Sequence, residues 1–133
     1  MRERCIQCAL ANTPTNVRYV QIRKDLCGYA TLQGPDTGRM AVPKPITRRA
    51  LYVFLHECAH FVLHADYKRN KRPRYLEEFE AETWARDKMR EAGIPVPRKE
   101  IVRAKEHVAQ HLKQVKRKKG RRLDPKMLAF ARS

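Results

Sequence analysis

The sequence of 133 residues lacks the features of a membrane or secreted protein. Its longest unbroken apolar run, from Ala50 to Leu55, is far shorter than the roughly 20 residues that cross a bilayer. The first residues contain no sustained apolar segment, so we expect no secretory signal. Four cysteines without such a signal fit reduced thiols better than a disulfide framework. We therefore expect a cytoplasmic protein with no membrane partner.

Acidic residues are also scarce. The chain has 14 Asp+Glu against 30 Lys+Arg, which gives a formal net charge of +16. Residues 98–133 alone hold 13 Lys+Arg and 3 Asp+Glu, so most of the excess is C-terminal. The hydrophobic content of 42% is too high for a disordered chain. We predict a folded core over residues 1–97 and a basic helix and tail over 98–133, packed on that core or extending from it.

The C-terminal charge predicts a non-specific contact with nucleic acid, because Lys and Arg neutralise phosphates without reading the base sequence. Few aromatic residues lie among these charges, so the stacking of single-stranded bases is not indicated. A solvated helix face and docking to an acidic partner are the alternatives. The candidate contacts are Lys116, Arg117, Lys118, Lys119, Arg121 and Arg122.

The N-terminal half predicts a small sheet. Residues 1–15 are polar and predicted to be irregular, whereas residues 17–22 are rich in β-branched and aromatic side chains. Residues 29–33 and 39–42 flank a loop that contains two glycines, which indicates a hairpin. Three short strands in succession predict an antiparallel sheet.

Helices follow the sheet, which gives an α+β fold. Thr47 is a suitable N-cap for a helix over 47–65. Gly93 ends a second helix over 76–92, and a third is predicted over 98–119. Residues 123–133 are predicted to form a short helical turn or a tail. In the first of these helices, apolar residues at helical spacing predict a buried side; they are Leu51, Phe54, Leu55, Cys58 and Val62.

The sharpest signal is H-E-x-x-H, from His56 to His60, in the middle of the first predicted helix. Residues four apart lie on one face of a helix, so two imidazoles can bind one metal ion at about 2.0–2.1 Å. Glu57 lies to the side of the two ligands, where it can take a proton from a metal-bound water. A buried helix with two hydrogen-bonded core histidines is the alternative.

A catalytic zinc ion needs a third protein ligand. His64 is about 12 Å from His56 along the helix axis, which is too far for one ion. The acidic cluster that begins the second helix supplies better candidates. Glu80 is the predicted ligand, and Glu77, one turn earlier, is the fallback.

Residues 50–85 resemble the ImmA/IrrE family of zinc metallopeptidases. The resemblance rests on the stretch from Leu51 to His64, which fits the family pattern H-E-x-x-H-x-x-x-H. It also rests on the stretch from Glu78 to Ala85, which follows the pattern E-x-E-A-N-x-F-A. Glu82 stands where the family prefers Asn, and Trp84 where it prefers Phe.

The resemblance implies one catalytic Zn²⁺, held by His56, His60 and Glu80, with Glu57 as general base. It further implies a zinc metalloendopeptidase that cleaves a peptide bond in an intracellular protein such as a regulator or repressor. The sequence shows no helix-turn-helix segment, which some members carry. The resemblance therefore supports the metal site better than it identifies the substrate.

Amide hydrolysis needs an oxyanion donor besides the metal ion. His64, Tyr67 and Tyr75 are the candidates, and His64 is also a candidate for supporting a metal ligand from behind. A peptide substrate is predicted to add to the edge of the sheet near residues 39–42, where backbone hydrogen bonds would place its carbonyl over the metal ion.

Two weaker patterns have simple alternatives. Cys5 and Cys8, with Cys27, are three potential ligands of a second zinc ion, but a structural site takes four and free thiols are the alternative. His107 and His111 are also four residues apart, but valine follows the first of them where a general base would stand. The alternative function for the whole chain is a non-catalytic, basic nucleic-acid-binding module with a structural metal ion. A regulatory protein that binds a partner through the sheet edge is a third possibility.

Overall fold

The computed structural model describes residues 1–32, 37–64, 73–116 and 124–133. The predicted site residue Tyr67 and the basic residues 117–122 lie outside these ranges, so the predicted nucleic-acid contact stays a prediction. Eight elements are described, in this order: α1 (Arg2–Asn12), β1 (Val17–Arg23), β2 (Tyr29–Leu32), β3 (Gly38–Pro43), α2 (Arg48–Leu63), α3 (Arg74–Glu91), α4 (Arg98–Lys116) and α5 (Pro125–Arg132). The predicted α+β class is confirmed.

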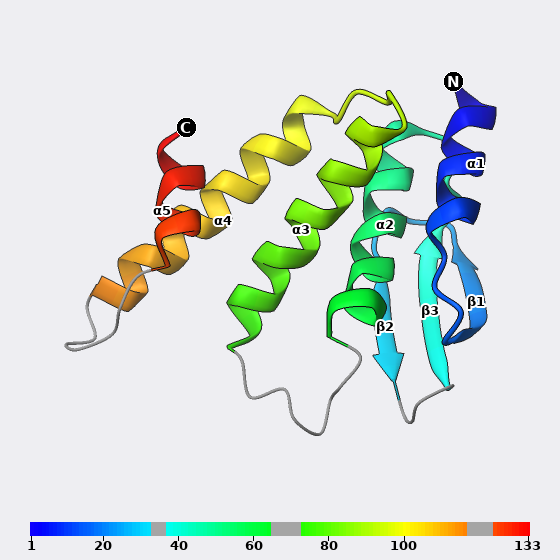
Figure 1. The fold of residues 1–133 in the computed structure, drawn as a ribbon, viewed down its shortest axis with the longest axis horizontal. Coiled ribbons are helices and arrows are strands. Elements are labelled where there is room, and N and C mark those ends of the chain that lie inside the picture. The colour runs from blue at the N-terminus through cyan, green and yellow to red at the C-terminus, as the bar shows by residue number, and fades with distance from the viewer. Residues whose placement is uncertain (33–36, 65–72, 117–123) are drawn as a thin grey trace. The chain divides into compact units, whose positions relative to one another are not determined.

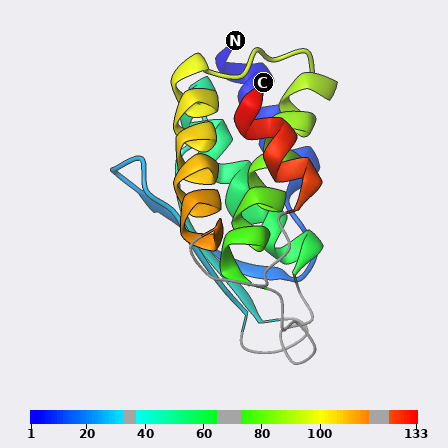
Figure 2. The ribbon, with the colours of Figure 1, turned by 90° about the vertical axis from the view of Figure 1, so that its left-hand side faces the viewer.

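The chain divides into two units, Met1–Val96 and Pro97–Ser133. The first unit contains the sheet and α1 to α3, with the helices on one side of the sheet (Figure 1, Figure 2). The second contains α4 and α5. None of the described helices is long and apolar enough to cross a membrane.

The sheet is mixed rather than antiparallel, with strand order β1-β3-β2. β2 pairs antiparallel with β3, as the predicted hairpin requires. β1 pairs parallel with β3, from Val17 opposite Gly38 to Arg23 opposite Pro43. The predicted antiparallel arrangement is therefore wrong for β1. The short connection from β1 to β2 reverses the chain, and β3 then enters between the two strands, so β1 and β3 run in the same direction.

Residues 2–12 form helix α1, which corrects the prediction of an irregular N-terminus. Its buried residues, Cys5, Cys8 and Ala9, are spaced three and one apart, which places them on one face of a helix. The helix ends where the side chains of Asn12 and Thr13 bond back to the carbonyls of Cys8 and Ala9, at 2.8 and 2.7 Å. Cys5 and Cys8 thus serve as small core residues.

Helix α2 contacts β2, β3, α1 and α3, so it is buried on more than one side. Thr47 is its N-cap and accepts a hydrogen bond from the backbone of Ala50 at 3.1 Å. Leu51 and Leu55 are fully buried, and each contributes about 2 kcal/mol through the apolar area it removes from water. Val62 was predicted to be buried but is 50% exposed. The neighbouring Phe61 is buried instead, with 3% of its surface exposed.

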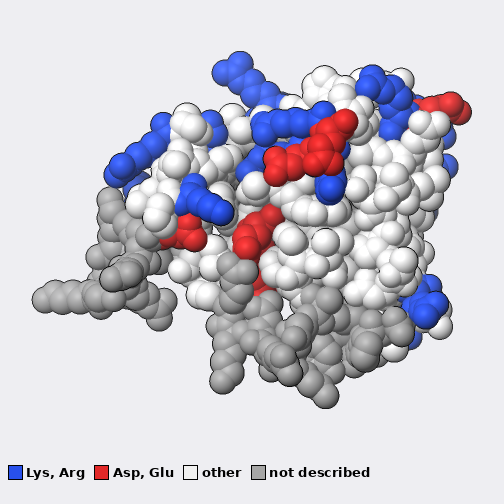
Figure 3. All heavy atoms as spheres, in the orientation of Figure 1, with Lys and Arg blue, Asp and Glu red and all other residues white. Residues whose placement is uncertain are grey.

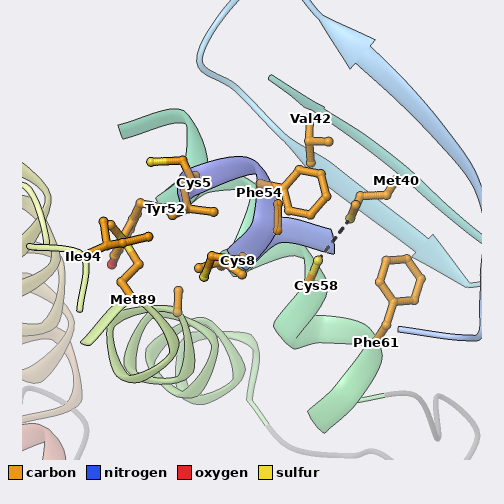
Figure 4. Close-up of a cluster of buried hydrophobic side chains, with 14 residues drawn as sticks. Cys5, Cys8, Met40, Val42, Tyr52, Phe54, Cys58, Phe61, Met89 and Ile94 are labelled. Carbon is orange, nitrogen blue, oxygen red and sulfur yellow. Dashed lines mark hydrogen bonds between the residues drawn. The ribbon is translucent and has the colours of Figure 1, made fainter. Parts of the chain in front are cut away.

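The core of the first unit gathers side chains from α1, α2, α3 and β3 (Figure 4). It is unusually rich in sulfur: the Cys58 thiol lies 3.9 Å from the Met40 sulfur. Burial raises the pKa of the Cys58 thiol to about 12, so this thiol stays protonated. The buried residues are Cys5, Cys8, Ala9, Met40, Val42, Leu51, Tyr52, Phe54, Leu55, Cys58, Phe61, Ala85, Met89 and Ile94.

Helix α3 ends at Glu91, and Gly93 follows as the predicted glycine beyond the helix end, with a φ of 69° in the left-handed conformation that favours glycine. The backbone N–H of Ile94 donates to the Met89 carbonyl at 2.9 Å, and that of Gly93 to the Arg90 carbonyl at 2.9 Å, which is a Schellman motif. The Arg4 guanidinium donates to the Ala92 carbonyl at 2.9 Å and so ties α1 to this helix end. These bonds fix the position of α3 against α1.

The second unit consists of two helices in contact. Ala104, Val108 and Leu112 form a buried stripe along α4, as their spacing predicts. Asp124 caps α5 by accepting from the backbone of Lys126 at 2.8 Å. The division between units lies one residue from the predicted boundary, and packing of the basic segment on the core stays a prediction.

Candidate metal centre

Helices α2 and α3 lie side by side and run in opposite directions (Figure 1). The H-E-x-x-H motif is on α2, as predicted, and the acidic cluster begins α3. On the face that Figure 3 shows, acidic side chains reach the surface over α3, among more numerous basic ones. The pairing of these two helices therefore brings imidazoles and carboxylates together.

The three groups that converge are His56, His60 and Glu78. The two carboxylate oxygens of Glu78 lie 2.8 Å from His56 Nε2 and 3.2 Å from His60 Nε2. Two ligands of a tetrahedral zinc ion, each bound at about 2.1 Å, are roughly 3.4 Å apart. The imidazole rings are edge to face, with centroids 5.1 Å apart. This set of two nitrogens and a carboxylate fits zinc in both type and spacing.

Glu78 occupies the place that the sequence analysis gave to Glu80, so that assignment is corrected. Glu80 instead lies 3.5 Å from His64 Nε2. The fallback residue, Glu77, belongs to a second group with His60 and His64. The physical reason is rotation: each residue turns a helix by about 100°, and the gap between the motif and α3 does not determine which carboxylate faces α2.

Burial and hydrogen bonding have opposite effects on the pKa values of Glu78 and His60. Burial opposes ionisation of Glu78, but its hydrogen bonds with His56 and His60 lower its pKa well below the usual range. Burial likewise opposes protonation of His60, but Glu78 outweighs this effect and raises the pKa of His60. The site therefore attracts a cation, whether a proton or a metal ion.

Glu57 lies beside the two imidazoles and is only 8% exposed. Burial raises the pKa of its carboxyl group, while the charges of His56 and His60 oppose that shift. The chain comes close to it at Gly28, where an added Cβ would stand 3.0 Å from Glu57 Cγ. A larger residue at this point would press on the Glu57 side chain. A general base with a raised pKa takes and returns a proton near neutral pH more readily than a free carboxylate.

Three residues that the sequence analysis did not assign to the site support His56 from behind. The Glu82 carboxylate lies 3.4 Å from His56 Nδ1 and accepts a hydrogen bond from the Tyr52 hydroxyl. Arg86 Nη1 lies 3.8 Å from Glu82 and donates to the Tyr52 oxygen at 3.4 Å. The signal was available in the spacing, since Glu82 is one helical turn after Glu78 and Tyr52 is one turn before His56.

His64 lies behind His60. The Nδ1 atoms of the two rings are 3.1 Å apart, and the side chain of His64 is only 4% exposed. Burial lowers the pKa of His64, and the nearby His60 adds to this effect. His64 is therefore buried against a ligand of the predicted ion.

The remaining predicted residues lie elsewhere. Tyr75 is partly buried in the first turn of α3. Cys5 and Cys8 are in the core, and Cys27 is exposed. Over the described ranges, the groups that can hold a metal ion contain no cysteine and neither His107 nor His111. The second zinc site therefore gains no support.

Comparison of the chain with protein-family models, curated proteins and solved structures found no match. The resemblance to the ImmA/IrrE family accordingly stays a prediction from the two motifs. The geometry of α2 and α3 supports a metal-binding site independently of that resemblance.

Proposed function

We propose that the protein is a zinc-dependent peptidase whose ion is held by His56, His60 and Glu78. The observation that carries the proposal is the convergence of these side chains, with the buried carboxyl group of Glu57 beside them. Two histidines and one glutamate, with the fourth position open, are the ligands of catalytic zinc in many metalloproteases. The resemblance to ImmA/IrrE peptidases points to the same reaction and to an intracellular regulator as the substrate.

In this mechanism the protein orients three ligands and moves one proton. A zinc ion held by His56, His60 and Glu78 would supply a Lewis acid that lowers the pKa of a bound water towards ~7 and polarises a carbonyl. Glu57 is placed to accept a proton from the attacking water and to pass it to the nitrogen of the leaving amine. Glu82 holds His56 in place through Nδ1, so that Nε2 faces Glu78.

The substrate is proposed to lie along β2. The earlier expectation of an edge near residues 39–42 is wrong, because these residues belong to β3, the central strand. β1 and β2 are the strands at the edges. β2 begins at Tyr29, directly after the close approach of Gly28 to Glu57. A peptide that adds to β2 through backbone hydrogen bonds would therefore pass beside the general base.

The decisive experiment compares the wild type with Glu57→Gln. The purified proteins are analysed for zinc and then incubated with a library of peptides, whose cleavage is followed by mass spectrometry. We expect both proteins to contain one zinc ion per chain, and hydrolysis by the variant to fall by about 10²- to 10⁴-fold. If the variant keeps zinc but loses activity, Glu57 acts as a general base and not as a zinc ligand.

A matched control is His107→Ala, at an exposed histidine of α4. It should keep both zinc and activity. Equal hydrolysis by the wild type and Glu57→Gln would overturn the assignment of Glu57. A wild type that is folded but takes up no zinc from solution would overturn the proposed function itself.

A further inference from the structure

The proposed peptidase uses His56, Glu57, His60 and Glu78, but it assigns no role to His64 and Glu80. We propose that these two residues form a chain of polar contacts, here called the relay, that positions His60 and fixes its tautomer. In this relay His60 carries its proton on Nδ1 and donates it to His64 Nδ1, and His64 in turn directs its Nε2 proton towards Glu80. The inference rests on the proposed function, since it explains how one metal ligand is held in the binding form.

The two nitrogens of His60 face different partners. Nε2 lies 3.2 Å from Glu78 Oε1, within the group that would bind the ion. Nδ1, on the other side of the ring, lies 3.1 Å from Nδ1 of His64. Two ring nitrogens at this distance attract each other only if one carries a proton and the other offers a lone pair. The contact therefore couples the tautomers of the two rings.

Metal binding decides which ring donates. A histidine ligand binds through a nitrogen without a proton, so Nε2 of His60 must be free of its proton. The proton of the neutral ring is then on Nδ1, and His64 must accept it with its own Nδ1. This leaves the His64 proton on Nε2, which lies 3.5 Å from Glu80 Oε1. The two atoms do not form a hydrogen bond with each other in the structure, but the carboxylate attracts the N–H dipole along this direction.

The position of His64 in the chain suits this task. It is the C-cap of α2, where its backbone N–H still donates to the His60 carbonyl at 3.0 Å. Its φ of −126° and ψ of 25° are not those of a helix, so α2 ends here. Only 4% of its side chain is exposed, so water has little access to the ring and a protein group must orient it. A histidine at an exposed edge of the site would not be held in this way.

The same residues permit a second reading, in which His60, His64 and Glu77 hold another ion. That ion would take Nδ1 of His60 while the first takes Nε2, so the ring would have to lose both protons. Neutral imidazole gives up its second proton only at a pH far above the physiological range, whereas the relay needs just the neutral ring. We therefore expect one ion per chain.

Glu82 and Glu80, which are not proposed as ligands, take similar places behind the two metal-binding histidines. His56 is held directly, with Nδ1 3.4 Å from Glu82. His60 has no carboxylate at that distance from its Nδ1 among the described ion pairs, and His64 fills the gap between it and Glu80. Each metal-binding histidine thus has a glutamate of α3 behind it, one directly and one through a second imidazole. Such outer partners orient the ring and strengthen metal binding.

The test compares His64→Ala with His64→Asn, whose side-chain oxygen can accept the His60 proton near the position of the lost Nδ1. Zinc affinity is measured by competition with a chromophoric chelator. We expect His64→Ala to weaken zinc binding by about 10- to 100-fold and His64→Asn to restore most of that loss. His107→Ala is the control and should bind zinc as the wild type does.

A second measurement needs no activity and starts from the metal-free protein. Nitrogen-15 NMR of the metal-free protein, at a pH where His60 is neutral, reports which ring nitrogen carries the proton. Because Nε2 of His60 faces the Glu78 carboxylate, we expect the metal-free wild type to hold the His60 proton on Nε2 and the His64 proton on Nδ1, where it donates to His60. Zinc should move the His60 proton to Nδ1 and the His64 proton to Nε2. If the wild type takes up no zinc, the proposed function fails, and the NMR result still decides the relay. The relay is overturned if the metal-free wild type carries the His64 proton on Nε2, or if the wild type binds a second ion that His64→Ala loses.

Discussion

Histidines four residues apart occur on two of the helices, and the pair His56 and His60 of α2 can be compared with the pair His107 and His111 of α4. Both pairs lie next to a buried stripe of their helix. The residue after the first histidine is buried in both, but on α2 it is Glu57, 8% exposed, and on α4 it is Val108, 6% exposed. The same spacing therefore places a carboxyl group beside one pair and an apolar side chain beside the other.

The partner helix makes the larger difference. α3 presents Glu78 to both histidines of α2. α5, the helix that contacts α4, contains no Asp or Glu between Pro125 and Arg132. Asp124, just before it, is occupied in capping α5. Histidine spacing alone thus says little about metal binding, and the third ligand on the neighbouring helix decides it.

The largest expected effect is the loss of zinc from one pair only. His56→Ala combined with His60→Ala should abolish zinc binding, because only Glu78 of the three ligands remains. Zinc at 100 times its dissociation constant stabilises a binding protein by about 2.7 kcal/mol, so addition of zinc should raise the Tm of the wild type but leave that of the double variant unchanged. Zinc content and thermal unfolding with and without zinc are the measurements.

The matched control carries His107→Ala and His111→Ala on α4. It should keep the zinc content of the wild type and the same rise in Tm. If the α4 variant loses zinc and the α2 variant keeps it, the comparison of the two pairs is reversed and the proposed site is wrong.

A smaller effect is expected to show whether Glu78 or Glu80 is the third ligand. Glu78→Ala removes a direct ligand and should weaken zinc binding by more than 100-fold. Glu80→Ala removes a group two steps from the ion, and a loss of about tenfold is expected. Titration with a zinc chelator measures both variants side by side. A larger loss for Glu80→Ala than for Glu78→Ala would restore Glu80 as the ligand.

The case of Glu78 shows what the sequence can and cannot predict. The cap at Thr47, the glycine beyond the end of α3 and the position of the motif on α2 follow from local rules, and the structure confirms them. The choice of Glu78 over Glu80 depends on how α3 is rotated against α2, which no short stretch of sequence determines. Supporting residues such as Glu82 depend on the same rotation.

The N-terminal region shows the same division between local and long-range information. Each strand could be predicted from its side chains, but the pairing of β1 with β3 depends on contacts between residues about 20 positions apart. α1 was missed because its overall polarity hides the spacing of Cys5, Cys8 and Ala9. The cysteines were considered as metal ligands there, although the helical spacing already indicated a buried face.

The smallest expected effect is in the titration of the histidines of α2 in the metal-free protein. Glu78 raises the pKa of His60 above its ordinary value of 6.5 against the opposing effect of burial, whereas burial lowers the pKa of His64 below that value. His60 therefore stabilises the fold below pH 6.5, and this contribution is lost as the pH rises through its folded pKa. The contribution of His64 has the opposite sign: it is present above pH 6.5 and is lost as the pH falls through its folded pKa.

Proton NMR of the imidazole C–H signals over pH 5 to 8 can follow both rings separately. We expect the midpoint of His60 above that of His64, although both lie on one helix and in contact with each other. Glu78→Gln should bring the two midpoints closer together, because it removes the charge that favours protonated His60. A midpoint for His64 above that of His60 would mean that the carboxylate of α3 does not act on the pair as its position implies, and the contrast with α4 would then lose its electrostatic basis.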